Sequence, residues 1–426
     1  MAMLNRRRWL GLAALAGGAA AIGLRPAETG APHDAFFTRL SQALRDAGLT
    51  QPTLVIDRER LHANARQVRA NLGRGLALRL VNKSLPCLPL LDEVARLTGT
   101  QRQMVFNLPY LRLMAEQRPE SDVLLGKPFS VAAAAQMLAQ PPRSGFDSSK
   151  QVQWLIDSPA RLAQYRDLAR GQRLPLRINV EIDVGLHRGG VPDEATLQQV
   201  IALLREEPLL RWSGLMGYDA HTEKIPDIGG TRADARAHVL QTYRTRLKAM
   251  QASGLMPVDG ALTLNTGGSP TYRLHREDGP ANEVAVGSAL VKPSDFDTPL
   301  LADLQAAAWI ATPALKVQGF VAPNGVEPLG QAAQLWDRNQ RTAHFIHGGH
   351  WLAHPVSPAG LQASGLIGPS SNQQLLLGSG RQGLRPDGLI FFRPTQSEAV
   401  LQQFGDIAVV EGDRVVTMWP VFPARG

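Results

Sequence analysis

Four side chains that can carry out chemistry stand at the ends of apolar, strand-like runs of this sequence. Lys83 comes directly after ALRLVN, and Arg188 lies just beyond LRINVEID. Tyr218 lies in GLMGYDA, and His221 follows it directly. A lysine amine can form a Schiff base with an aldehyde, and a guanidinium can bind a phenolate oxygen. A tyrosine or histidine beside a substrate carbon can move a proton, so Tyr218 and His221 are candidate catalytic residues.

Two glycine-containing turns follow later strand-like runs. The first turn, after ALTLN, consists of Thr266, Gly267, Gly268 and Ser269, and the second, after NEVAV, consists of Gly287 and Ser288. Glycine-rich turns expose backbone N–H groups that bind a phosphate with no side chain in the way. Asn265 and Tyr272 flank the first turn, where they are candidates for contacts with a ring or a phosphate. Singly, each signal has an ordinary explanation as a solvated lysine or a plain turn; in this order they point to one binding site.

The elements that must position these residues alternate between strands and helices. Helical patterns such as LPLLDEVARL and EATLQQVIALLREE lie between most of the strand-like runs. Eight strands of this kind are the number for a closed parallel barrel, in which reactive groups come from the carboxyl ends of the strands. We therefore predict an α/β fold, a (β/α)8 TIM barrel over residues 50–298. The eight expected strands are ALRLVN (77–82), QMVFN (103–107), DVLLG (122–126), QWLID (153–157), LRINVEID (176–183), GLMGYDA (214–220), ALTLNT (261–266) and NEVAVG (282–287).

The sequence changes character after about residue 300. Short β-like runs, ATPALKVQGF, RTAHFIHGG, DGLIFFRP and DIAVVEGDRVVTMWPVF, are separated by Gly, Pro, Asn and Ser turns. We therefore predict a smaller C-terminal β-rich domain formed by residues 33–57 and 299–426, which follows the barrel.

Five segments resemble the fold-type III pyridoxal-phosphate enzymes, within the D-threonine aldolase and D-serine dehydratase-like branch that shares the alanine racemase N-terminal barrel. They are PTLVIDRERLHANA, VNKS, EIDVGLHRGGV, LNTGGSPT and EVAVGSAL. The resemblance implies pyridoxal 5'-phosphate as cofactor, with Lys83 as its Schiff-base lysine and Arg188 as a cofactor contact. It places Gly267, Gly268, Ser269, Gly287 and Ser288 around the phosphate. Members of this family use the cofactor as an electron sink for a carbanion of an amino acid.

The sequence departs from this family at two places. Members usually have a histidine two positions before the lysine, where this chain has Val81, and the aldolases and dehydratases carry a His-x-Cys or His-x-Asp metal pair near the C-terminus. The tail here ends DRVVTMWPVFP with neither ligand, which puts a divalent-metal step in doubt and predicts no metal ligands. The histidines of HFIHGGHWLAH are interpreted as surface or substrate-facing residues rather than a metal site. The polar stretch FFRPTQSEAVLQQFGD (391–406) is either a substrate-carboxylate pocket from the β domain or a polar turn.

Three functions of different classes follow from these features. The resemblance favours an enzyme that acts on amino acids as a lyase, an aldolase or dehydratase of D-3-hydroxy amino acids. An amino-acid racemase of the same fold needs two bases on opposite faces of Cα, and a non-catalytic cofactor-binding protein needs none. A barrel hydrolase would need paired carboxylates, for which only Asp183 and Asp219 qualify. The resemblance also implies a homodimer in which the partner's tail completes the site.

The N-terminal sequence has the pattern of a targeting segment. Asn5 is followed by three arginines at 6–8, including the twin Arg6 and Arg7, and then by an apolar run over 9–24. This length is that of a signal h-region rather than a bilayer span, and the pattern resembles a twin-arginine export signal. We therefore predict that residues 1–30 are a signal or anchor segment, and that the protein is periplasmic or anchored to the membrane.

Composition restricts the remaining classes. The chain is 44% hydrophobic and 19% charged, as in globular proteins with a core. The net charge of +8 is spread over the chain and forms no basic stripe with aromatic residues, so a nucleic-acid partner is not expected. Cys87 is the one cysteine, which excludes an intramolecular disulfide and a cysteine-based zinc site and reads as a buried apolar residue.

Overall fold

The computed structural model describes residues 25–257, 261–276, 279–398 and 400–423, which divide into two compact units. The sheet unit contains the chain up to Val55, Trp309–Pro394 and Gly412–Val416. The barrel unit contains Ile56–Ala308, Thr395–Glu411 and the chain from Thr417 onward. Sequence alone placed all of residues 299–426 in the β-rich domain, whereas the contacts group residues 299–308, Thr395–Glu411 and the chain from Thr417 onward with the barrel.

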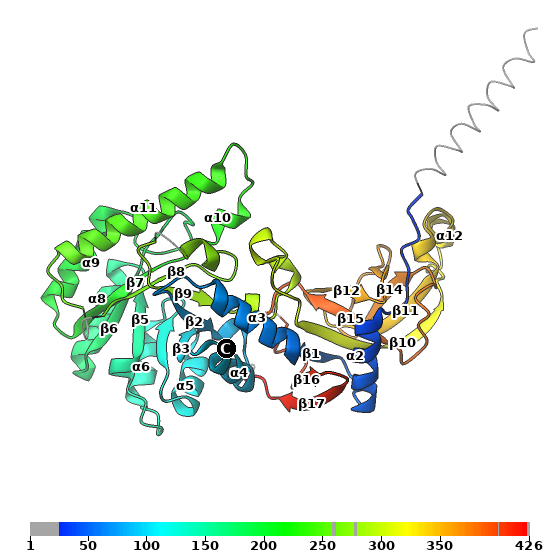
Figure 1. The fold of residues 1–426 in the computed structure, drawn as a ribbon, viewed down its shortest axis with the longest axis horizontal. Coiled ribbons are helices and arrows are strands. Elements are labelled where there is room, and N and C mark those ends of the chain that lie inside the picture. Colours follow the sequence, from blue (N-terminus) through cyan, green and yellow to red (C-terminus); the bar gives the residue numbers. More distant parts are fainter. Residues whose placement is uncertain (1–24, 258–260, 277–278, 399, 424–426) are drawn as a thin grey trace, which may run out of the picture. The chain divides into compact units, whose positions relative to one another are not determined.

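Eight parallel strands close into a barrel, as predicted (Figure 1). The sequential neighbours pair in order, and β9 pairs with β2 through Ala77 opposite Glu283 to close the ring. Most positions of these strands are buried, because side chains fill the interior and helices cover the outside. The strands are β2 (Ala77–Val81), β3 (Arg102–Val105), β4 (Asp122–Leu125), β5 (Val152–Ile156), β6 (Leu176–Glu181), β7 (Leu210–Gly217), β8 (Thr263–Thr266) and β9 (Glu283–Val286).

Helices of the barrel unit precede each of the barrel strands or connect them, and several begin at clear sequence signals. Side chains of Asp57, Asn107, Ser130, Ser158 and Asp193 each accept a hydrogen bond from a backbone N–H of the first turn of the helix that follows, which stabilises the start of that helix. The helices are α3 (Arg58–Asn71), α4 (Leu88–Thr98), α5 (Leu108–Gln117), α6 (Val131–Ala139), α7 (Ser148–Gln151), α8 (Pro159–Gln172), α9 (Glu194–Glu206), α10 (His221–Lys224) and α11 (Thr231–Ala252).

A buried ionic network lies at the amino ends of the strands, opposite the predicted site. The Glu283 carboxylate, which is inaccessible to solvent, accepts hydrogen bonds from Arg79 Nε at 2.6 Å and from Arg102 Nη1 at 2.7 Å. Arg79 also donates to Asp122 Oδ1 at 3.0 Å. The network therefore connects β9, β2, β3 and β4, the strands on both sides of the closure.

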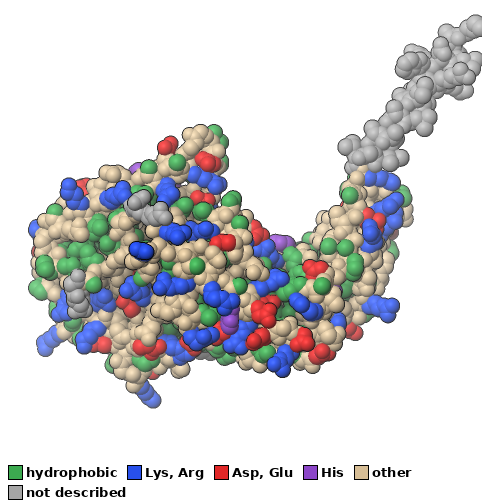
Figure 2. Space-filling view, viewed as in Figure 1, with side chains coloured by type: hydrophobic (Ala, Val, Ile, Leu, Met, Phe, Trp, Pro, Cys, Tyr) green, Lys and Arg blue, Asp and Glu red, His purple; other side chains and the backbone are tan. Residues whose placement is uncertain are grey.

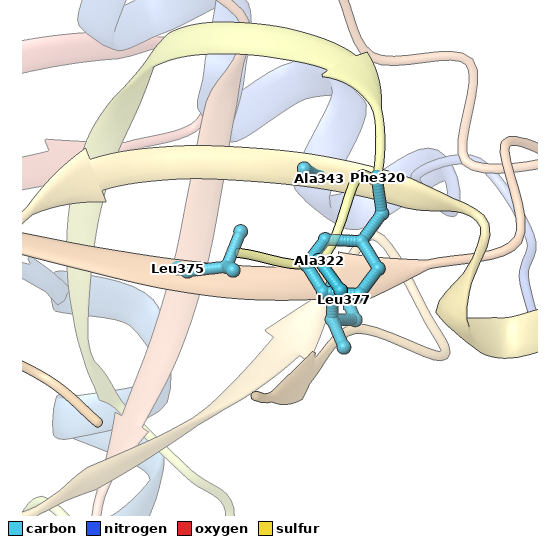
Figure 3. Close-up of a cluster of buried hydrophobic side chains, with 5 residues drawn as sticks. All are labelled: Phe320, Ala322, Ala343, Leu375 and Leu377. Carbon is cyan, nitrogen blue, oxygen red and sulfur yellow. The ribbon is translucent and has the colours of Figure 1, made fainter. Parts of the chain in front are cut away.

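The sheet unit contains the β-rich domain that the sequence predicts, and its strands pair mainly antiparallel. The order is β13-β14-β11-β10, and β15 pairs with both β10 and β12. The buried side chains of Phe320, Ala322, Ala343, Leu375 and Leu377 form one of its apolar clusters (Figure 3). The elements are α2 (Ala35–Asp46), β10 (Ala308–Gly319), α12 (Glu327–Trp336), β11 (Thr342–His347), β12 (Ala353–Ser357), β13 (Gln362–Ala363), β14 (Gln373–Gly378) and β15 (Leu389–Pro394).

The remaining strands are β1 (Thr53–Asp57), β16 (Ile407–Glu411) and β17 (Arg414–Trp419). Short 3-10 helices follow several strands: η1 (Asn82–Ser84), η3 (Tyr272–His275), η4 (Ser288–Leu290), η5 (Ser294–Phe296), η6 (Pro299–Leu301) and η7 (Arg338–Gln340).

Three further findings concern the surface charge, the cysteine and the predicted export signal. Basic and acidic side chains are mixed on the face shown in Figure 2. Cys87 is buried just before α4, and burial raises the pKa of its thiol to about 12. The predicted export signal falls mostly on residues 1–24, outside the described residues; from residue 25 onward, the described helices include none long and apolar enough to cross a membrane.

Candidate active site at the barrel mouth

A pocket opens at the carboxyl ends of the barrel strands and gathers most of the residues predicted from sequence. Its walls include the apolar side chains of Met104, Phe106 and Met216. The predicted residues that line it are Lys83, Arg188, Tyr218, Asn265, Gly267, Gly268, Ser269, Gly287 and Ser288.

Lys83 places its amine inside this pocket. It lies in η1, directly after β2, and its side chain is 44% exposed, so a ligand in the pocket can reach it. Lys83 Nζ lies 3.2 Å from Glu398 Oε1 and 5.0 Å from the centre of the Phe106 ring. The amine thus has a carboxylate on one side and an aromatic face near it.

The glycines of the two turns lie where a larger residue would be strained or would clash. Gly267 has φ +67°, which favours glycine, and a Cβ on Gly268 would lie 2.6 Å from the Tyr218 ring. A Cβ on Gly287 would lie 2.6 Å from Ser84 Cβ. Ser269 Oγ joins the turns, because it accepts hydrogen bonds from the N–H groups of Gly287 and Ala289, each at 3.1 Å.

A buried polar network supports the first turn from behind. Asp219 Oδ2 lies 2.7 Å from His275 Nε2, and Asp219 Oδ1 accepts a hydrogen bond from Thr271 Oγ1 at 2.6 Å. Thr271 Oγ1 in turn accepts one from the N–H of Gly268 at 3.1 Å. All three side chains are buried, so the network fixes the turn without facing the pocket.

Arg188 lies over the ring of Tyr218, with 4.7 Å from its guanidinium carbon to the ring centre. Burial raises the pKa of Tyr218, although the charge of Arg188 opposes that shift.

Glu181, at the end of β6, shares a smaller adjoining cavity with the side chains of Arg188 and Tyr218. Burial and the Asp157 carboxylate raise the pKa of Glu181 to about 7, against the pull of Arg188.

Three predicted site residues are not among those that line the pocket. Thr266 is buried and donates from Oγ1 to the carbonyl of Gly217 at 2.9 Å. The Tyr272 hydroxyl accepts a hydrogen bond from Asn71 Nδ2 at 3.0 Å. His221 begins α10 with its ring against Gly185, and burial lowers its pKa. Their predicted roles stay predictions.

Sequence reasoning missed the position of Glu398 and the network of Asp219 and His275. Glu398 stands in the polar stretch 391–406 that sequence marked as a candidate substrate pocket, but its contact is with Lys83, far away along the chain. The spacing of polar residues in the sequence carried no signal for either pairing.

The histidines of the sheet unit do not gather into a ligand set. His344 and His347 lie on β11, His350 has φ +53°, and His354 lies on β12. Among the residues that the structure describes, no group of three or more His, Cys, Asp or Glu side chains could hold a metal ion.

The pocket fits the cofactor that the sequence resemblance implies. Pyridoxal phosphate needs an accessible amine, donors for an anionic phosphate and flat walls for its ring. Lys83 provides the amine, and the two turns, whose Gly268 and Gly287 leave no room for a Cβ, present Ser269, Ser288 and their main chain at the surface of the pocket. Arg188 and Tyr218 provide a cation and a ring on the same rim.

Comparisons with known proteins agree with this fit. Residues 56–295 match the family model "Alanine racemase, N-terminal domain". The curated 3-hydroxy-D-aspartate aldolase of Paracoccus denitrificans (strain Pd 1222) is 22% identical over 255 residues, 59% of this chain. The match spans 62% of the length of that relative.

Two solved structures share the fold over nearly their whole length. D-threonine aldolase from Filomicrobium marinum superimposes with a TM-score of 0.70 at 18% identity, covering 93% of this chain and 98% of that chain. D-threo-3-hydroxyaspartate dehydratase from Delftia sp. HT23 gives 0.69 at 17% identity, covering 88% and 97%. Because the family model covers more than half of the sequence, the chain belongs to the family of the alanine racemase N-terminal domain.

Proposed function

We propose that this protein is a pyridoxal-phosphate-dependent lyase that cleaves or dehydrates D-3-hydroxy amino acids. Family membership implies the cofactor. One observation carries the proposal: the Lys83 amine is accessible in a pocket at the carboxyl ends of a closed eight-stranded barrel. The substrate class is supported by the relatives, whose names are those of an aldolase and a dehydratase of such amino acids.

Each side chain of the pocket then has a stated task. Lys83 Nζ would be the atom to which the cofactor aldehyde attaches, and the hydroxyl and N–H groups of Ser269 and Ser288 would hold the phosphate. Arg188 would bind an oxygen or nitrogen of the ring. When bound, the cofactor supplies an electron sink for negative charge on the amino-acid Cα. Tyr218 is the candidate proton donor or acceptor within the pocket.

The test is a substrate panel combined with a lysine exchange. Purified protein is incubated with D- and L-amino acids, and glycine plus aldehyde, keto acid plus ammonia, and inversion are assayed with and without chelator. We expect Lys83→Ala to lose the visible absorbance of the cofactor and more than about 100-fold of the turnover. Lys127→Ala changes an exposed lysine two positions after β4; it is the matched control and should keep both.

The other outcomes identify the alternatives. Inversion without cleavage would replace the lyase by a racemase, and cofactor binding without any turnover would leave a binding protein. Wild-type protein without a borohydride-trapped adduct at Lys83 would contradict the whole proposal.

We also propose, from the N-terminal sequence and the family resemblance, that the protein is exported by a twin-arginine pathway and works as a homodimer. A folded-protein export route suits an enzyme that takes up its cofactor in the cytoplasm. A monomer in analytical ultracentrifugation would contradict the dimer.

A further inference from the structure

A carboxylate lies against the amine at the centre of the pocket. Glu398 Oε1 accepts hydrogen bonds from Lys83 Nζ at 3.2 Å and from Ser84 Oγ at 2.6 Å. Its side chain is 30% exposed and lines the same pocket, so a ligand can touch it. Burial works to raise the pKa of Glu398, but Lys83 and the Ser84 hydroxyl together hold it below its usual range. Glu398 is therefore an anion at neutral pH.

Hydroxyl groups fix the orientation of this carboxylate. Ser397 Oγ donates to Glu398 Oε2 at 3.3 Å, and Ser288 Oγ lies 3.4 Å from Oε1. A carboxylate held by several donors keeps one position while its surroundings change.

Two other acidic side chains of the barrel mouth are bound to neighbours, and Glu181 lines the smaller adjoining cavity instead of this pocket. Asp219 is buried and bound by Thr271 and His275, and Asp183 is bound by His187. Among the described residues, Glu398 is the one acidic side chain that lines the pocket of Lys83.

We propose that Glu398 accepts the proton of the substrate's 3-hydroxyl group during Cα–Cβ cleavage, an inference that rests on the proposed function. The amino nitrogen of a substrate would take the place of Lys83 Nζ at the cofactor aldehyde, and its 3-hydroxyl oxygen is three bonds from that nitrogen. An acceptor 3.2 Å from Nζ therefore lies within reach of the hydroxyl.

The step balances without a further reactant. Glu398 takes the O–H proton, and the electron pair of that bond forms the carbonyl of the aldehyde product. The Cα–Cβ bond would break with its electron pair left on Cα, for which the bound cofactor would supply the electron sink, and a proton taken up at Cα would give glycine. The proton on Glu398 then passes to solvent, to which its side chain is exposed.

The experiment compares two reactions of the cofactor-loaded protein that differ in their need for this proton transfer. Cleavage of D-threonine needs an acceptor for the hydroxyl proton, whereas exchange of the Cα hydrogen of D-alanine in D2O does not. We expect Glu398→Gln to slow cleavage by at least about 100-fold and to change exchange by less than about fivefold. Glu398→Asp should recover part of the cleavage rate, because it restores a carboxylate.

A spectroscopic readout tests the contact with the amine independently of turnover. Removing a negative charge beside a cationic nitrogen lowers its pKa. In substrate-free, loaded protein, we therefore expect Glu398→Gln to move the midpoint of the pH-dependent visible absorbance to lower pH. Asp406→Asn removes an exposed carboxylate from the same segment and serves as the control, which should leave the rates and the midpoint unchanged.

The outcomes separate this inference from the proposed function. Equal loss of cleavage and exchange in Glu398→Gln, or unchanged cleavage, would overturn the role of Glu398 while the lyase stands. Wild-type protein that exchanges D-alanine but cleaves none of the 3-hydroxy amino acids would overturn the proposed function, and this role with it.

Discussion

The raised pKa of Glu181 makes the stability of the folded protein depend on pH. Burial and Asp157 raise its pKa from 4.5 to about 7, so between these values the folded protein binds more protons than the unfolded chain. The free energy of unfolding therefore falls as the pH rises through this window. The sign is opposite to that of Glu398, whose pKa is lowered and whose contribution to stability is lost as the pH falls.

This difference gives a prediction for cofactor-free protein. In wild type, the free energy of unfolding should fall between pH 5 and pH 8 as Glu181 loses its proton. We expect this fall to be smaller by about 2 to 3 kcal/mol in Glu181→Gln. Urea unfolding at the two pH values measures it. Glu194→Gln, an exposed carboxylate, is the control, and an identical pH slope for Glu181→Gln and wild type would contradict the assignment.

At the scale of single residues, sequence reasoning succeeded where a residue type and its place after a strand carried the information. Lys83, Arg188 and the two glycine turns are of this kind, because the carboxyl ends of barrel strands must meet at one rim. The contact of Glu398 with Lys83 depends on the path of a segment far away along the chain, and no local pattern encodes that path.

At the scale of elements, the eight barrel strands were predicted because burial on both faces gives continuous apolar runs. The elements that sequence missed, α12 and β12 to β14, are short or carry polar, glycine and proline residues, so their periodicity is weak. The site inherited this difference: residues that closely follow a barrel strand were found, whereas the contact of Glu398, on the connection between β15 and β16, was not.

The closure of the barrel yields a prediction at this scale. Arg79 is inaccessible to solvent. Glu283→Ala would therefore leave the Arg79 guanidinium buried, with the Asp122 carboxylate as its remaining acidic partner. We expect a loss of about 3 to 5 kcal/mol in the free energy of unfolding. The half-exposed pair of Arg118 and Asp92 is the control, where Asp92→Ala should cost less than about 1 kcal/mol. Equal losses for the two variants would show that the buried network does not hold the ring closed.

At the scale of the whole molecule, the N-terminal arginines lead to a prediction about transport. If residues 1–30 direct twin-arginine export, replacing Arg6 and Arg7 together by lysine should keep the protein in the cytoplasm, because that pathway reads the arginine pair. Cell fractionation followed by immunoblotting measures the distribution. Arg25→Lys, which lies after the apolar run, is the control, and unchanged export of the double variant would contradict the assignment.

The solitary thiol of Cys87 has a practical consequence. Thiol reagents attack the thiolate, and burial keeps this sulfur protonated and out of reach at neutral pH. A cysteine introduced at an exposed position would therefore react with a spin label or fluorophore against a silent background. Distances between such labels could then be measured in native protein without first removing Cys87.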